Sequence, residues 1–298
     1  MKAKTQTLRP SSGDRGLLAA AGALSVALSG ALGFTTGRLT APVKTGASRI
    51  AASAVPASTA PTPPVGTALA VEDGSPAPGE VLGRLAVAAR ASSAAPSESL
   101  MTEVHGSPAL GPRGKATLLY VGAEYCPFCA ATRWALVVAL DRFGTLSGLR
   151  LMTSSATDYA PNTPTFTFAG ATYRSRYVSL RAVELTTNQP SSQGAFGYVP
   201  LETPTRAEDA VWKKYDPQGS IPFLALGRGA VSQTDIGAPY SPLLLAGLSW
   251  QTISRGVEEA AQGKPGAPAY GTDILTAANA FTQAICKEDG GEPQAVCR

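Results

Sequence analysis

The chain has 298 residues and a formal net charge of +4, with 44% hydrophobic residues, 24 Pro and 31 Gly. The basic excess lies in residues 1–50, which contain seven Lys or Arg and a single acidic residue, Asp14. The remainder is slightly acidic and lacks the basic footprint that nucleic-acid binding requires, so we expect no nucleic-acid partner. The high Pro and Gly content indicates that part of the chain is linker.

The N-terminal region has the pattern of an export or membrane-anchoring segment. Residues 16–37 contain no charged residue, and basic residues precede them. About 20 apolar residues suffice to cross a bilayer, and preceding positive charges favour a cytoplasmic start. We therefore expect residues 1–15 to be a cytoplasmic basic tail and residues 16–37 a single-pass transmembrane helix or signal anchor. The alternative is a cleaved signal peptide, which would make the protein secreted.

Residues 38–78 are dominated by Pro, Ala and Ser, with Thr and Gly. Such a composition buries too little apolar surface to fold, and its prolines keep a chain extended. We expect a stalk that holds one folded domain, residues 79–298, outside the membrane.

The folded part reads as alternating strands and helices. Residues 116–121 form an apolar run typical of a buried strand, and a helix is expected from Pro127 to just before Gly144. The remaining expected elements are helices at 81–90, about 205–216, about 241–262 and 272–286, strands at 149–152, 220–226 and just after 229, and a hairpin of 165–168 with 172–180 around 169–171. This order predicts an α/β fold, a sheet with flanking helices.

The motif Cys126-Pro127-Phe128-Cys129 falls at the start of the expected helix. Zinc would need further ligands, and the spacing of the other cysteines and the single His105 does not resemble a zinc site, so we expect no metal. At a helix start the unpaired N–H groups stabilise a thiolate. This predicts Cys126 as a nucleophile and Cys129 as the resolving thiol, with no cofactor, while a static disulfide stays an alternative.

The segment from Leu118 to Cys129 resembles the central strand and active-site loop of the thioredoxin superfamily. Ile221-Pro222, followed by a strand, a glycine turn and a last helix, resembles the cis-proline loop of that superfamily. The resemblance implies a thioredoxin-like sheet, with Pro222 beside the dithiol and Ile221 offering its backbone to a bound chain. We expect Ile221, Pro127 and Phe128 to contact the substrate.

Two positions depart from the superfamily pattern. Tyr120 stands where thioredoxins place a buried acid six residues before the first cysteine, and Phe128 stands where strong oxidants often carry His. Glu124 is the nearest candidate proton carrier, with a solvated turn residue as the alternative. The direction of electron flow, oxidase or reductase, stays open.

Residues from about 115 to 298 resemble more closely an exported prokaryotic family catalogued as domain of unknown function 929. The stretches that carry this resemblance are 122–134, 214–223, 246–250 and 285–297. Cys126 and Pro222 lie 96 positions apart, which predicts an inserted subdomain over about 155–215.

Cys286 and Cys297 enclose a hydrophilic turn, and an exported protein would oxidise them to a structural disulfide. The sequence as a whole predicts an extracytoplasmic protein thiol–disulfide oxidoreductase whose partners are protein thiols or disulfides and a redox protein. A thioredoxin-like binding module without catalytic activity is the alternative, since a fold does not fix a function.

Overall fold

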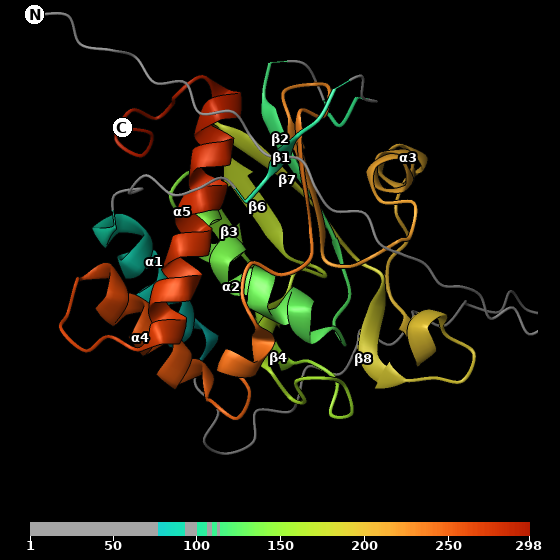
Figure 1. The fold of residues 1–298 in the computed structure, drawn as a ribbon, viewed down its shortest axis with the longest axis horizontal. Helices are drawn as coiled ribbons and strands as arrows, with labels where there is room; N and C mark the ends of the chain where they lie inside the picture. The colour runs from blue at the N-terminus through green and yellow to red at the C-terminus, as the bar shows by residue number, and fades with distance from the viewer. Residues whose placement is uncertain (1–76, 93–99, 106–108, 112–113) are drawn as a thin grey trace, which may run out of the picture. The chain divides into compact units, whose positions relative to one another are not determined.

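A computed structural model describes residues 77–92, 100–105, 109–111 and 114–298 (Figure 1). The predicted tail, the predicted membrane segment and nearly all of the predicted stalk lie outside these residues. Within the described residues, no helix has the length and apolar character needed to cross a membrane.

The central sheet has five strands in the order β1-β11-β10-β2-β7. Strand β2 runs parallel to β7, and the other neighbouring pairs are antiparallel. All seven residues of β2 are buried, which explains why its sequence is an unbroken apolar run rather than an alternating one. The strands are β1 (Thr102–Glu103), β2 (Ala116–Gly122), β7 (Val178–Glu184), β10 (Phe223–Gly227) and β11 (Gln233–Ile236).

One face of the sheet carries the larger core. Leu118 and Tyr120 of β2 point into a cluster that contains buried side chains of α2 (Pro127–Asp141) and α5 (Ala269–Asp289). Helix α2 is buried on nearly every side, from Cys129 to Leu140, because α5 covers it and the sheet lies beneath it. This position fixes the start of α2 at the end of β2.

The opposite face is covered by α3 (Arg206–Tyr215). Leu119 and Val121 of β2 pack there with Val211 and Trp212 of α3, as the period-two alternation of a strand requires. The predicted capping box is present: Thr205 accepts the backbone N–H of Glu208, and the Glu208 carboxylate accepts that of Thr205. The prediction of this helix is confirmed.

Two further helices, α1 (Pro78–Ala91) and α4 (Trp250–Ala261), pack against each other on the α2 side. Arg142, just after α2, donates hydrogen bonds of 2.6–2.7 Å to Ser92, Asn279 and Thr282. Burial lowers the pKa of Arg142 to about 10. One side chain therefore links the C-terminal ends of α1 and α2 to α5.

The predicted helix over about 241–262 is wrong at its start. The structure has a short 3₁₀ turn, η2 (Pro242–Leu244), and then begins α4 at Trp250. Gly247 between them has φ 77°, and Ser249 accepts the backbone N–H of Thr252 as the N-cap. The chain therefore leaves helical geometry at a glycine and restarts at a capping serine.

The predicted hairpin around 169–171 is also wrong. Strand β3 (Gly144–Ser147) pairs with β6 (Thr172–Ser175), and β4 (Arg150–Thr153) pairs with β5 (Pro164–Thr167). The four strands form one long ribbon that turns back at 154–163. Gly148, between β3 and β4, faces Gly170, between β5 and β6, and their φ angles are 78° and 75°. The strand pairing is therefore interrupted at the same point on both sides of the ribbon.

The predicted insertion over about 155–215 is too long. Strand β7 lies within it but belongs to the central sheet, where Val178 and Val183 are buried. Helix α3 likewise covers that sheet. The segments that leave the sheet are the β3–β6 ribbon and a smaller ribbon of β8 (Thr186–Pro190) with β9 (Tyr198–Pro200).

The structure contains the predicted disulfide between Cys286, in the last turns of α5, and Cys297, with Cα atoms 5.4 Å apart. The bond fixes the C-terminal turn against the helix.

We expect the double substitution Cys286→Ser/Cys297→Ser to lower the free energy of unfolding of the full chain by about 2.5–3 kcal/mol, the chain entropy released by opening a loop of this size. Guanidinium unfolding followed by tryptophan fluorescence measures the change. An unchanged midpoint would show that α5 and the turn hold together without the bond.

Candidate functional site

The dithiol lies where β2 ends and α2 begins. Cys126 is the N-cap of α2, with extended backbone, and Pro127 occupies the first helical position, where its missing N–H costs nothing. The turn before it is held by hydrogen bonds from the backbone N–H of Cys126 to Ala123 and of Glu124 to Thr186. The predicted unit of strand, dithiol and helix is confirmed.

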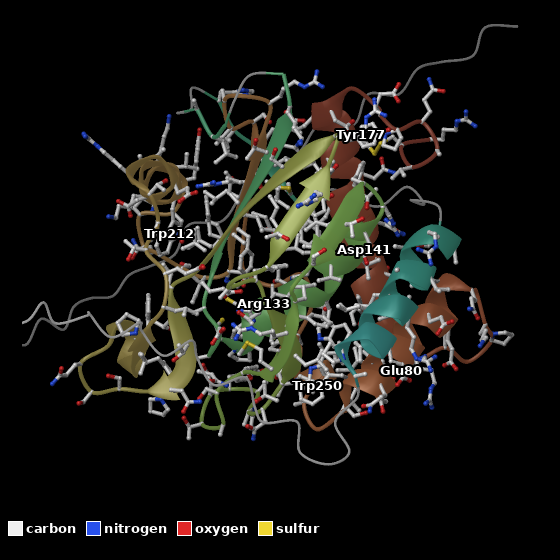
Figure 2. The ribbon with its side chains drawn as sticks, turned by 180° about the vertical axis from the view of Figure 1, so that it is seen from behind. Glu80, Arg133, Asp141, Tyr177, Trp212 and Trp250 are labelled. Atoms are coloured by element: carbon white, nitrogen blue, oxygen red, sulfur yellow. A yellow bond between two sulfur atoms is a disulfide. The ribbon has the colours of Figure 1, made fainter. Side chains whose placement is uncertain are left out.

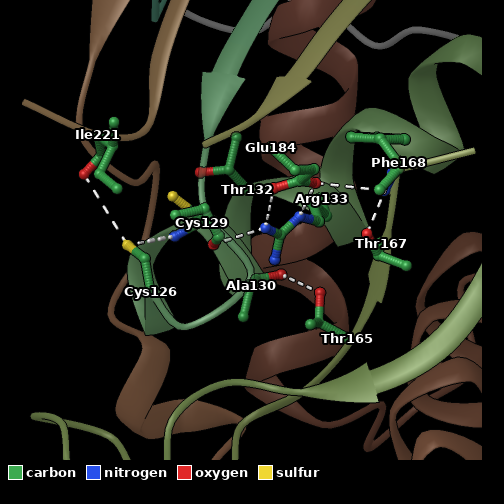
Figure 3. A network of polar contacts seen from close by, with 12 residues as sticks. Cys126, Cys129, Ala130, Thr132, Arg133, Thr165, Thr167, Phe168, Glu184 and Ile221 are labelled. Carbon is green, nitrogen blue, oxygen red and sulfur yellow. Dashed lines mark hydrogen bonds and ion pairs between the residues drawn. The ribbon is translucent and has the colours of Figure 1, made fainter. Parts of the chain in front are cut away.

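The two sulfurs have different surroundings (Figure 3). The Cys126 Sγ accepts the backbone N–H of Cys129 at 3.2 Å and lies 4.0 Å from the Ile221 carbonyl oxygen. Cys126 keeps 4% of its surface exposed and Cys129 none, and both thiols are free. Solvent and any reactant therefore approach the dithiol through Cys126.

These surroundings shift the two pKa values in opposite directions. The hydrogen bond from the Cys129 thiol lowers the pKa of Cys126, with further help from backbone N–H groups and from the charge of Arg133. Burial raises the pKa of Cys129 well above its usual range, and its hydrogen bond to Cys126 adds to the rise. Cys126 is thus the thiol that ionises first, and Cys129 keeps its proton.

The predicted cis-proline loop reaches the dithiol. The Ile221–Pro222 peptide bond is cis, and the Pro222 carbonyl accepts the backbone N–H of Gly237 at 2.9 Å. The Trp212 indole donates to the Ser220 carbonyl at 3.2 Å and fixes the loop from the other side. The Ile221 carbonyl is the group of this loop that contacts Cys126.

Pro127 and Phe128, the other expected substrate contacts, differ in exposure. Pro127 is buried, whereas 38% of Phe128 is exposed and its ring stacks on Tyr159 with centroids 5.6 Å apart. Phe128 therefore presents an aromatic surface two positions after the accessible sulfur.

A buried ion pair that the sequence analysis did not identify lies next to the dithiol (Figure 3), and Figure 2 shows where its Arg133 lies in the fold. Arg133, one turn after Cys129, donates two hydrogen bonds of 2.6 and 2.9 Å to the carboxylate of Glu184 and one of 2.7 Å to the Ala123 carbonyl. Both charged side chains are fully buried. One guanidinium therefore connects α2, the active-site turn and the end of β7.

The sequence does hold a signal for this pair. Arg133 is the only charged residue of the helical segment before Asp141. A helix that is apolar on all faces is buried, and a buried charge needs a partner. The partner, Glu184, is 51 positions away in the chain, and no residue near Arg133 in the sequence indicates it.

Tyr120, six residues before Cys126, is fully buried, and its hydroxyl has no hydrogen-bond partner among the described residues. The Arg133 guanidinium lies 5.8 Å from its ring centroid. Gly122 leaves room for the hydroxyl, since a Cβ there would be 2.1 Å from it. Burial raises the pKa of Tyr120 well above its usual range, so the phenol stays protonated and accepts no proton from a thiol.

Glu124 is buried, with 6% exposed, so its interpretation as a solvated turn residue is wrong. Burial raises the pKa of Glu124, and the nearby Glu184 adds to the rise, while Thr167 and Arg133 oppose it. The carboxyl group belongs to the same buried cluster as the ion pair. Within the described residues, no group of three His, Cys, Asp or Glu side chains could hold a metal ion.

We expect Arg133→Met to leave the buried Glu184 carboxylate without a partner and to lower the free energy of unfolding by about 3–5 kcal/mol. It should also raise the pH midpoint of Cys126 alkylation, because a positive charge that favours the thiolate is lost. If this variant does not fold, Arg133→Met/Glu184→Gln also removes the unpaired carboxylate, and the pH midpoint of Cys126 alkylation is measured in that double variant.

Arg181→Met is the matched control. The Arg181–Glu208 pair is likewise in direct contact, with nitrogen and oxygen 2.9 Å apart, but the Arg181 side chain is 55% exposed. It should cost about 1 kcal/mol or less and leave the midpoint in place. An unchanged midpoint after loss of Arg133 would show that the guanidinium serves packing alone.

A family model matches the part of the chain that contains the dithiol, and the match ends before Ile221 and Pro222. No curated protein and no solved structure matched the chain. The family described as Domain of unknown function (DUF929) matches residues 105–218. The matched segment contains the dithiol and both partners of the buried ion pair, and it confirms the resemblance to domain of unknown function 929 over these residues.

Proposed function

We propose that the protein is an extracytoplasmic thiol–disulfide oxidoreductase that uses Cys126 and Cys129 on protein substrates. The observation that carries this proposal is the inequality of the two thiols at the start of α2. A sulfur of lowered pKa on a residue that keeps 4% exposure, next to a fully buried sulfur of raised pKa, is the pair that disulfide exchange needs.

The exchange proceeds in two balanced steps. The Cys126 thiolate attacks one sulfur of a substrate disulfide, the substrate S–S bond breaks, and the departing substrate thiolate takes up a proton. Cys129 then gives up its proton, and its sulfur attacks Cys126 and releases the second substrate thiolate. Counting the proton that Cys126 loses when it ionises, two electrons and two protons pass to the substrate, and Cys126–Cys129 becomes a disulfide. The reverse sequence oxidises a substrate dithiol, and a redox partner protein restores the starting state.

The second step needs an acceptor for the proton of Cys129. Tyr120 cannot serve, because its phenol is already protonated. Glu124 is the proposed acceptor: it is a buried carboxyl group of raised pKa in the same cluster as Arg133 and Glu184. A carboxyl group whose pKa is raised can both take and return a proton.

The order of the elements around the dithiol supports the proposal. Strand β2, which lies between β10 and β7, leads into the dithiol. The neighbouring antiparallel strand β10 begins directly after Ile221-Pro222, and α5 follows as the last helix. Export is supported by the Cys286–Cys297 disulfide, since such bonds persist in oxidising compartments. Anchoring through residues 16–37 is part of the same proposal, with a secreted form as the alternative.

We expect iodoacetamide to alkylate Cys126 of the full chain with a pH midpoint below about 8.5, while Cys129 reacts slowly because it is buried. Replacing Cys129 by Ala removes the resolving step, so mixed disulfides between Cys126 and its partners should accumulate. Replacing Cys126 should trap almost nothing. Non-reducing electrophoresis and mass spectrometry identify the adducts.

A catalytically inactive binding module is the competing function. It would show an ordinary midpoint for Cys126 and no trapped adduct in either single variant. Cys286→Ser/Cys297→Ser is the matched control for loss of a cysteine pair: the trapping by Cys129→Ala should persist in its background.

A further inference from the structure

Most of the large exposed apolar side chains belong to segments next to the dithiol. The large hydrophobic side chains that are more than a third exposed in the described residues are Val87, Phe128, Tyr159, Phe196, Val199, Ile236, Leu243 and Leu244. All except Val87 belong to the first turn of α2 or to segments that contact it, the active-site turn or the Pro222 loop. An exposed apolar surface of this kind indicates an interaction site.

Aromatic rings form the centre of this surface. Phe128 stacks on Tyr159 at 5.6 Å, whereas Tyr125 stacks on Tyr198 at 4.2 Å and lies 6.0 Å from Phe196. Tyr125 precedes Cys126 and Phe128 follows it, so the two ring groups flank the accessible sulfur in the chain. We call these five side chains the aromatic surface.

Hydrogen bonds hold the supporting loops in place. The Ser155 backbone N–H donates to the Tyr125 carbonyl at 2.8 Å, and the Tyr198 hydroxyl donates to the Ser155 hydroxyl at 2.7 Å. Asn188 joins β8 to the carbonyl of Thr153 at 3.0 Å. The turn of the long ribbon, the β8–β9 ribbon and the active-site turn are therefore one connected unit, and the rings need little rearrangement before a partner binds.

The surface is almost free of charge. The segments 154–163, 186–200 and 236–249 contain one charged residue, Asp158, although 15% of the chain is charged. The ionisable side chains described next to the dithiol, Arg133, Glu184 and Glu124, are buried, and the first two are paired with each other. Recognition at this surface therefore relies on apolar contact rather than on charge.

We propose that the aromatic surface binds an extended polypeptide segment in which aromatic or aliphatic residues flank a cysteine, and that it disfavours charged flanks. The inference rests on the proposed function and names its substrate class. Cys126 is only 4% exposed, so a substrate sulfur has to reach a nearly buried sulfur, which a flexible segment does more readily than a rigid folded surface. Unfolded or newly exported chains expose such segments.

A lipid surface is the other chemistry that an uncharged aromatic face fits. The position of the dithiol argues for a polypeptide, because a bilayer covering the rings would also cover the sulfur that has to react. The two occupants are separated by the experiment below.

The test uses the Cys129→Ala full chain in lipid nanodiscs and two peptides whose single cysteine carries a 2-thiopyridyl group. Phe and Leu flank the cysteine in one peptide, and alternating Lys and Asp flank it in the other. Attack by the Cys126 thiolate forms the mixed disulfide and releases 2-thiopyridone, which is followed by absorbance. We expect the apolar peptide to react at least about tenfold faster, and salt between about 0.05 and 0.5 M to change its rate less than about twofold.

In the same background, Tyr159→Ser/Phe196→Ser should reduce the preference for the apolar peptide to less than about threefold, since two exposed rings of the surface are lost. Val87→Ser is the matched control: Val87 is exposed on α1, away from the surface, and its replacement should leave both rates unchanged.

Three results would contradict these proposals. Equal rates for the two peptides overturn the inference and leave the proposed exchange activity intact. No reaction with either peptide overturns the proposed function and the inference with it. Brominated lipids that quench a tryptophan introduced by Phe196→Trp, but not one introduced by Val87→Trp, would identify the surface as a membrane contact and overturn the inference.

Discussion

The ion pair between Arg133 and Glu184 is the interaction on which the geometry of the dithiol depends. Its two side chains are fully buried, and their bidentate hydrogen bonds join the first turns of α2 to the end of β7, while the third bond reaches the carbonyl of Ala123 in the active-site turn. The backbone N–H of Phe168 donates to the same carboxylate. Because a buried charge is tolerated only when paired and hydrogen-bonded, the three segments are held to a single arrangement around this pair.

That arrangement makes the two cysteines chemically different. The N-cap position, the hydrogen bond from Cys129 and the charge of Arg133 all favour the Cys126 thiolate, whereas burial keeps Cys129 protonated. The Tyr120 phenol stays protonated, and the Glu184 carboxylate is engaged by Arg133. Glu124, a buried carboxyl group of raised pKa in the cluster of Arg133 and Glu184, is the proposed proton acceptor.

Charge is thus concentrated inside the site and nearly absent from its rim. The interior pair acts on the thiols through the low dielectric of the core, while the uncharged aromatic surface faces the solvent. Such a division lets the reactivity of the dithiol and the choice of substrate be set by separate residues. The two ribbons that leave the sheet have a role in this division. The long ribbon contains Tyr159, and the segment of the β8–β9 ribbon contains Phe196 and Tyr198, whose rings contact Phe128 and Tyr125 on either side of Cys126 in the chain.

Local sequence determined the elements whose causes are local. The apolar run of β2, Pro127 after the N-cap cysteine, the capping box of α3 and the closely spaced Cys286 and Cys297 each depend on residues near one another in the chain, and all could be predicted. Only the tertiary structure decided the pairing of the long ribbon, the place of β7 in the central sheet, the partner of Arg133 and the assembly of the aromatic surface. These depend on contacts between residues tens of positions apart, and neither periodicity nor propensity specifies which distant segments meet.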